Sequence, residues 1–376
     1  MKRLVSALCC AALPLAGQAQ ITATGPIDRA ARAEVIEGVS QQILKHYIFL
    51  DQAQAMVAAV RERQQKHEYD SFNDGLSFAA KLNADLQAVS HDKHMEVGYS
   101  LPPIPVPATE NMAEADAKAR TASFQKPAAP LNWPPCKPGS LQNFAFGSAE
   151  CLSGNIGLLK LHDHLPAPAE AMPYLSAAMN SFASTRALII DVRQGYGGES
   201  DTVFMLESYL FDHATPMDDF YFRDTDKTLR NATSEKVKGK KYGQKKSIYV
   251  LTGRLTFSAH ENLAYDLQAY KRATLVGDKT LGGAHPVAVF RINEHFDVRV
   301  PNGNSINPVT KANWDGAGVM PEVAVNETDA LNVTQVLALK KIMQTERNAA
   351  SVAQLRQRVQ ELQGQIVSPE AVKAVR

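Results

Sequence analysis

The stretch 247–270 constrains the fold most strongly, because its hydrophobic period changes within a few residues. Residues 247–251 (Ser-Ile-Tyr-Val-Leu) form an apolar run that includes β-branched residues, as expected of a buried strand. Thr252 and Gly253 indicate a turn, and residues 259–270 then carry apolar side chains at helical spacing. The stretch is therefore predicted to form a strand, a tight turn and a helix. The rest of the chain is interpreted around this unit.

Ser258 lies at this turn, at the predicted start of the helix. Its hydroxyl would be exposed at the end of a strand and would face the free N–H groups and the positive dipole end of a helix. Such donors suit an oxyanion that develops during a reaction, so Ser258 is a candidate nucleophile. The alternative is that Ser258 only caps the helix, which is a common role for serine.

Alternating strands and helices follow from residue 155 onward, which predicts an α/β (α+β) fold with a mixed sheet between helical layers. Predicted strands cover 156–161, 187–192, 248–251, 274–276, 287–292 and 296–300, with a strand or hairpin over 220–229. Predicted helices cover 167–182, 201–211, 259–270 and 328–343. Amphipathic periods in 27–89 predict a small bundle of three or four helices before this core.

A length of 376 residues favours two main domains. We predict a signal peptide over 1–19, a helical domain over 20–92, a core domain over 93–345 and a C-terminal helix over 346–376. Residues 103–150 open with a Pro/Ala-rich stretch, and we interpret them as a linker or surface excursion. Heptad-like spacing in 349–366 fits either packing on the core or a dimerising coil, and its short span favours packing.

The N-terminus predicts export. Met1-Lys2-Arg3 is followed by a short apolar run and by small residues before a plausible cut at Gln20, which is the pattern of a secretory signal peptide. Cys9 and Cys10 would leave with it. The remaining pair, Cys136 and Cys151, is expected to form a disulfide in an oxidising compartment, periplasmic or extracellular. Two free buried thiols are the alternative.

Charge and composition exclude several other classes. The formal net charge is +1, which gives no global reason to expect nucleic acid or an anionic membrane as a partner. The lysine-rich patch at 236–246 is interrupted by glycines and is interpreted as a solvated loop. After the signal no apolar run is long enough to span a bilayer. No metal-ligand spacing, phosphate loop or dinucleotide fingerprint stands out, so neither a metal nor a cofactor is predicted.

Four motifs in one order give the chain a family resemblance. They are Asp92-Lys-His94, Asp191-Val-Arg-Gln-Gly-Tyr-Gly-Gly198, Thr256-Phe-Ser258-Ala-His-Glu261, and Gly277-Asp-Lys-Thr-Leu-Gly-Gly-Ala-His-Pro286 followed by Trp314-Asp-Gly-Ala-Gly-Val-Met-Pro-Glu322. The set resembles the tail-specific (C-terminal-processing) serine peptidases, in particular the branch with interphotoreceptor retinoid-binding protein and the tricorn core.

This resemblance implies a Clp-protease/crotonase-like core preceded by the helical unit. A PDZ domain is not expected, because 102–135 is too short to contain one.

The resemblance also implies a catalytic set. Ser258 would be the nucleophile, activated by His94 as general base, because serine needs a base to take its proton. Asp315 would orient His94 and stabilise its cation. It replaces the family's glutamate and is one methylene shorter. His94 as an ordinary loop histidine is the alternative.

Backbone donors and one further acid complete the predicted site. The Gly197 and Ala259 amides would form the oxyanion hole, while a glycine-rich turn without a ligand is the alternative. Glu261 matches the family pattern and would also cap the helix. The family's lysine base falls in 281–286, which contains no lysine, and Lys279 lies in a turn. A Ser258–His94–Asp315 system is therefore favoured over a Ser–Lys dyad.

Three functions are compatible with the sequence. The favoured one is an exported serine endopeptidase that cleaves peptides or unfolded proteins through an acyl-enzyme. A non-catalytic protein that binds an apolar ligand or a peptide is the alternative, since one fold can host both. An esterase or other acyl hydrolase is the third. The sequence predicts no oligomeric state.

Overall fold

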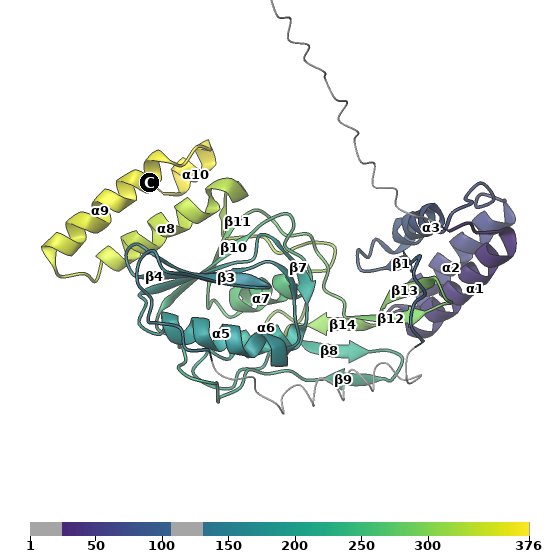
Figure 1. Cartoon of the computed structure of the whole chain (residues 1–376), viewed down its shortest axis with the longest axis horizontal. Coiled ribbons are helices and arrows are strands. Elements are labelled where there is room, and N and C mark those ends of the chain that lie inside the picture. Colours follow the sequence, from purple (N-terminus) through teal and green to yellow (C-terminus); the bar gives the residue numbers. More distant parts are fainter. Residues whose placement is uncertain (1–24, 107–130, 376) are drawn as a thin grey trace, which may run out of the picture.

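The central feature of the computed structural model is a mixed seven-stranded sheet with helices on both faces (Figure 1). The model describes residues 25–106 and 131–375, so the predicted signal peptide lies outside the described residues. The sheet has the order β15-β11-β10-β6-β4-β3-β2. Its strands are β2 (Leu141–Phe144), β3 (Gly147–Leu152), β4 (Ile156–Leu161), β6 (Ala187–Asp191), β10 (Ser247–Thr252), β11 (Thr274–Gly277) and β15 (Val323–Ala324).

Strands β15 to β4 run parallel, whereas β3 and β2 are antiparallel. The predicted α/β class with a mixed sheet is thus confirmed. The middle strands are apolar on both faces, as expected for parallel strands covered by helices. In β6, Leu188 and Ile190 belong to one buried cluster, while Ala187 and Ile189 belong to the other.

Each face of the sheet has its own set of helices. The first cluster includes side chains of α5 (Pro168–Phe182), α6 (Ser200–Glu207) and α7 (Ala259–Ala269). The second includes side chains of α8 (Glu327–Met343), α9 (Ala349–Gly364) and α10 (Pro369–Ala374). The C-terminal helix α9 buries Leu355, Val359 and Leu362 against this second face.

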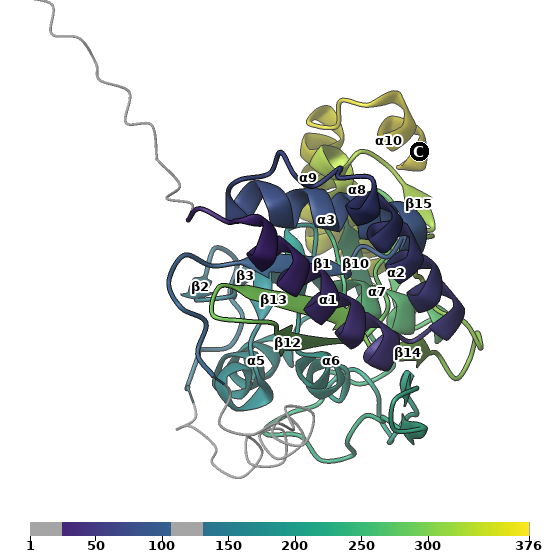
Figure 2. The ribbon, with the colours of Figure 1, turned by 90° about the vertical axis from the view of Figure 1, so that its right-hand side faces the viewer.

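The N-terminal region is helical, as predicted, and consists of α1 (Arg29–His46), α2 (Leu50–Gln65) and α3 (Gly75–Ser90). These helices share a core with a separate sheet of order β1-β13-β12. Its strands are β1 (Glu96–Tyr99), β12 (Val287–Arg291) and β13 (Phe296–Pro301). Strands from late in the chain therefore lie beside the first helices, as Figures 1 and 2 show.

The hairpin of β8 (Asp219–Phe222) and β9 (Lys227–Leu229) matches the strand or hairpin predicted over 220–229. The predicted C-terminal helix over 346–376 is divided into α9 and α10. Three short strands were not expected: β5 (Asp163–Leu165), which pairs with β7 (Gly195–Gly198), and β14 (Gly303–Ile306), which lies beside β8. Strands β2 and β3 lie almost wholly within 103–150, the stretch interpreted as an excursion.

Cys136 and Cys151 form the predicted disulfide, with Cα atoms 5.5 Å apart. Among the described residues, no helix combines the length and apolar character needed to cross a membrane.

Candidate active site

Ser258 lies at the carboxyl end of β10, immediately before α7. It is the N-cap of this helix, with φ of 53° and ψ of −122°. A positive φ is uncommon for a residue other than glycine, and such strained backbone tends to occur at functional sites, where the surrounding structure maintains it. The predicted strand–turn–helix arrangement is therefore observed, and Ser258 occupies the strained turn.

Glu261 holds this turn in place through four hydrogen bonds. One carboxylate oxygen accepts from the Ser258 amide at 2.8 Å and from the Gly283 amide at 2.9 Å. The other accepts from Thr280 Oγ1 at 2.5 Å and from the Gly282 amide at 2.6 Å. Burial raises the pKa of Glu261, although these donors oppose the shift. Glu261 thus caps α7, as expected, and also ties residues 280–283 to the nucleophile turn.

Gly197 approaches Ser258 from β7. A Cβ atom placed on Gly197 would lie 3.3 Å from Ser258 Cβ and 3.7 Å from Ser258 Oγ. Only a residue without a side chain fits here comfortably, and the φ of 131° also favours glycine. The turn and the glycine strand are therefore adjacent, as the predicted oxyanion hole requires.

The two predicted oxyanion donors differ in their surroundings. The Gly197 amide donates to Nδ1 of the buried His260 at 3.2 Å, so it already has a partner. Ala259 is the first residue of α7, where a backbone N–H has no intrahelical acceptor. In this arrangement the Ala259 amide is available to an oxyanion, whereas the Gly197 amide must first leave His260.

His94 lies between α3 and β1, next to the residue that precedes Ser258. Its ring packs on the Phe257 ring with centroids 4.5 Å apart. Burial lowers the pKa of His94 to about 4, so the imidazole is neutral at neutral pH and able to accept a proton. Its Nδ1 is buried without a hydrogen-bond partner among the described residues. Within the described residues, no hydrogen bond joins the His94 imidazole to the Ser258 hydroxyl.

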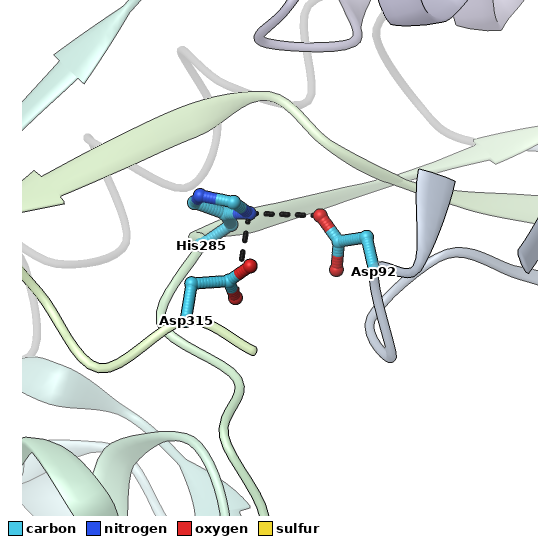
Figure 3. A group of neighbouring side chains, drawn as sticks. All are labelled: Asp92, His285 and Asp315. Atoms are coloured by element: carbon cyan, nitrogen blue, oxygen red, sulfur yellow. Dashed lines mark hydrogen bonds and ion pairs between the residues drawn. The ribbon is translucent and has the colours of Figure 1, made fainter. Parts of the chain in front are cut away.

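Asp315 faces a different imidazole from the one predicted. Its Oδ1 accepts from the Ala284 amide at 3.0 Å and lies 3.6 Å from His285 Nδ1. The same nitrogen is 2.8 Å from Asp92 Oδ2. Figure 3 shows both carboxylates approaching this one nitrogen, with the other ring nitrogen directed away. Asp92 is also hydrogen-bonded to the His94 amide, at 2.9 Å, which links the trio to the predicted base.

The titration of this trio reflects both its burial and its internal charges. Burial opposes ionisation of Asp92, but the hydrogen bond and charge of His285 outweigh it, so the pKa of Asp92 is lowered. Burial would lower the pKa of His285, yet the hydrogen bond and charge of Asp92, with Asp315, raise it. Burial raises the pKa of Asp315, and His285 only partly offsets this.

The structure therefore brings Ser258, Gly197, Ala259 and Glu261 together at one turn and places His94 next to it. The residues that sequence reasoning did not assign are Asp92, His260 and His285. Asp92 and His285 both stand inside the motifs, but 193 positions separate them, and no spacing rule connects such distant residues. His260 lies two residues after Ser258, where a helical pattern alone gives it no role.

Comparisons with known proteins give two family matches. The model of the peptidase family S41 domain matches residues 155–325. A second model, the N-terminal domain of this family in eukaryotic IRBP, matches residues 27–129. Together the two matches span most of the chain.

Solved structures support the fold. A candidate peptidase from Parabacteroides merdae is 16% identical with a TM-score of 0.54, over 78% of this chain and 90% of that one. A lipoprotein from Streptococcus agalactiae is 11% identical with a TM-score of 0.52, over 82% and 96%. Mature CPAF is 13% identical with a TM-score of 0.51, over 79% and 94%. With both family domains and the strained serine turn present, the chain belongs to peptidase family S41 and is a serine peptidase.

Proposed function

We propose that this protein is an endopeptidase in which Ser258 attacks the peptide bond and His94 is the general base. The observation that carries the proposal is the strained Ser258 turn at the N-terminus of α7, flanked by Gly197 and by a neutral, buried imidazole. A neutral imidazole is the form that accepts a proton, and the helix terminus supplies a dipole suited to negative charge.

In the proposed reaction, Ser258 Oγ forms a bond to the carbonyl carbon as its proton moves to His94. The carbonyl oxygen becomes an oxyanion, which the Ala259 amide binds. His94 then gives the proton to the departing amine as the C–N bond breaks, leaving an acyl-enzyme. Water attacks this ester with His94 again as base, which releases the new carboxyl terminus and restores Ser258.

Two changes would complete the site when substrate binds. The unpartnered Nδ1 of His94 needs an acceptor, and we assign this role to Asp315. The Gly197 amide would exchange His260 for the substrate oxyanion. Hydrogen bonds in an unliganded active site are often long or misaligned, so their absence here is compatible with catalysis.

Exposed apolar side chains around the turn support a peptide substrate with apolar residues. Tyr196 lies next to Gly197 and is 55% exposed, and Leu255, three residues before Ser258, is 58% exposed. Leu281, 39% exposed, precedes the Gly282 amide held by Glu261. Large exposed apolar residues near a nucleophile fit a site that binds extended or unfolded chains.

Hydrolysis of denatured casein and of a peptide blocked at both ends tests the proposal, because blocked ends admit only internal cleavage. The parent chain from Gln20 should cleave both substrates, and Ser258→Ala and His94→Ala should abolish cleavage. Activity that survives in His94→Ala would contradict the choice of base. A folded parent that cleaves neither substrate would favour the alternative, a protein that binds an apolar ligand or a peptide.

We also infer that the protein is exported. The charged and apolar segments of residues 1–19 support this inference, as does the Cys136–Cys151 disulfide, because such bonds persist in oxidising compartments. Expression in a bacterial host followed by cell fractionation and N-terminal sequencing is the test. We expect a chain beginning at Gln20 outside the cytoplasm, and an uncleaved cytoplasmic chain would contradict the inference.

A further inference from the structure

We propose that Asp92, His285 and Asp315 form a binding site for one zinc ion beside the peptidase site. One ligand atom from each residue lies within 4.8 Å of the other two. The dashed contacts in Figure 3 join His285 Nδ1 to Asp92 Oδ2 and to Asp315 Oδ1. Sequence spacing predicted no metal site, because the three residues come from separate loops and meet only in the folded chain.

The distances suit a small tetrahedral ion. Zinc binds imidazole nitrogen and carboxylate oxygen at about 2.0–2.2 Å, so neighbouring donors in a tetrahedron lie about 3.4 Å apart. The separations of His285 Nδ1 from the Asp92 and Asp315 oxygens, 2.8 Å and 3.6 Å, lie on either side of this value. For these two pairs, adjustments of about half an ångström would give the tetrahedral spacing. Three protein donors with a fourth position open to water or substrate is a common zinc arrangement.

The donor set also selects the metal. An imidazole nitrogen with two carboxylate oxygens suits zinc, whereas calcium and magnesium take oxygen donors alone. The ion would replace the proton that His285 shares with Asp92. Its double charge would balance the two carboxylates, of which Asp92 is 1% exposed and Asp315 22% exposed in their side chains.

Surrounding hydrogen bonds already orient the ligands, as is usual at metal sites. The second oxygen of Asp92 accepts from the His94 amide at 2.9 Å, and the Tyr47 hydroxyl donates to Asp92 Oδ2 at 3.3 Å. The Ala284 amide donates to Asp315 at 3.0 Å. The Phe49 ring packs edge-on against His285, with ring centroids 5.5 Å apart. These contacts limit the rearrangement needed to bind an ion.

Zinc at this position would act on stability and on catalysis. It would join the segment after α3, which carries Asp92, to the core loops that carry His285 and Asp315. It would also keep Asp315 away from His94, so zinc should inhibit peptide hydrolysis. This second effect rests on the proposed function, whereas zinc binding itself does not.

Calorimetric titration of the Ser258→Ala chain from Gln20 with zinc chloride measures binding without any catalytic readout. This chain lacks Cys9 and Cys10, two thiols that would bind zinc themselves. We expect one equivalent to bind, with an increase in melting temperature. His285→Gln and Asp315→Asn, made in the same background, should each weaken binding by more than about tenfold. The melting temperature of each variant is also measured without zinc, so that a folding defect can be distinguished from a loss of zinc binding.

His67→Gln is the matched control. His67 Nδ1 is 3.1 Å from Asp70 Oδ2, so it is also a His–Asp pair, but an exposed one with two donors only. This variant should bind zinc as the parent does. No zinc binding by the parent, or binding that His285→Gln and Asp315→Asn leave unchanged, would overturn the proposal.

The effect of zinc on hydrolysis is measured with the parent chain, in which Ser258 is intact. Zinc should inhibit casein hydrolysis by the parent, and excess chelator should restore it. If zinc binds one to one but hydrolysis continues, the inhibitory consequence is wrong while the site stands. If the parent is inactive both with and without zinc, the proposed function fails independently of the titration, whereas hydrolysis that requires zinc would overturn the inhibitory consequence alone.

Discussion

At the scale of single residues, Ser258 and Glu261 explain how a strained turn is maintained. The backbone of Ser258 lies outside the regions that most residues adopt, which costs of order 1–3 kcal/mol. Four donors on the Glu261 carboxylate, drawn from the turn and from residues 280–283, offset this cost. The nucleophile position is therefore set by a buried side chain three residues later along the chain.

The pH dependence of hydrolysis tests the state of His94. Its pKa is lowered to about 4 by burial, so His94 is protonated and inactive as a base only below this value. We expect kcat/KM to rise with pH to a plateau above about pH 5, because this profile reports the free enzyme. The measurement uses a blocked peptide between pH 3.5 and 8, with circular dichroism at each pH to monitor folding. A midpoint near the ordinary histidine pKa of 6.5 would contradict the account.

Gly197→Ala tests the close approach of β7 to the nucleophile. The new methyl group would lie 3.3 Å from Ser258 Cβ in a backbone that disfavours a side chain, so we expect hydrolysis to fall by more than about 100-fold, an oxyanion-type loss. Gly139→Ala is the control, since Gly139 also has a positive φ but its Cβ would meet open space. Both variants should lose of order 1–3 kcal/mol of stability, because each puts a side chain on a backbone with positive φ. Equal activity in the two variants would contradict the assignment.

Sequence reasoning located Ser258 and Glu261 because local signals define them: a change of period at the turn, and an acid three positions into a helix. It placed His94 through a motif. It could not foresee that Asp315 faces His285 or that the Gly197 amide donates to His260, because these contacts depend on how distant loops pack. Asp315 is one methylene shorter than the family's glutamate, so the sequence raised the question of whether its carboxylate reaches His94. Only the folded structure shows that its neighbouring imidazole is His285.

At the scale of elements, α6 and α7 enclose a group of buried acids unrelated to the predicted site. Glu207 and Asp266 have no exposed surface, and Asp218 lies in the loop before β8. Neither oxygen of Glu207 has a hydrogen-bond partner within the described residues. Burial, then the charge of Asp218, raises the pKa of Glu207 well above its ordinary value, so this carboxyl is favoured in its protonated form.

Glu207→Gln should therefore stabilise the protein at high pH. The raised pKa of Glu207 means that the folded state holds a proton that the unfolded state releases above about pH 4.5. Its contribution to stability is present below that pH and is lost as pH rises through the folded pKa.

We expect the variant to gain roughly 1–3 kcal/mol in free energy of unfolding at pH 8 and little at pH 4.5, measured by urea denaturation. Glu62→Gln, on the surface of α2, should change little at either pH. A loss of stability at pH 8 in Glu207→Gln would contradict this interpretation.

Long periodic elements were predicted well, and so were short apolar strands such as β11, whereas other short strands were missed. Helices α5 and α8 and the buried strand β6 carry patterns that extend over many residues or form a continuous apolar run. Helix α6 ends at Glu207 rather than 211, where the Ser208 hydroxyl donates to the Phe204 carbonyl at 2.7 Å. Strands β2 and β3 follow a Pro/Ala-rich stretch and are defined by pairing, of β3 with β4 and of β2 with β3, which no local pattern reveals.

At the scale of the whole molecule, the chain combines an N-terminal helical unit, a sheet core and a C-terminal helical layer. Strands β12 and β13 leave the core to complete the sheet on which α1 and α3 pack. The loop 278–286 before β12 carries Gly283 and His285, and Asp92 follows α3. The predicted base and its neighbours thus lie where the helical unit meets the core.

Loss of the disulfide should lower global stability without changing catalysis. The bond closes a loop of 15 residues, which corresponds to about 3 kcal/mol in the chain-entropy account. The double variant Cys136→Ser, Cys151→Ser should unfold at lower urea concentration, with kcat unchanged, because β3 lies three strands from β10 in the sheet. A stability equal to that of the oxidised parent would contradict the prediction.

Covalent trapping tests the central claim, that Ser258 is an activated nucleophile, most directly. The parent chain is treated with a fluorophosphonate, which reacts with activated serine, and the modified residue is located by peptide mass spectrometry. The account predicts a single adduct on Ser258 that forms much more slowly in His94→Ala. An adduct on another serine, or casein hydrolysis by a protein in which Ser258 stays unmodified, would contradict it.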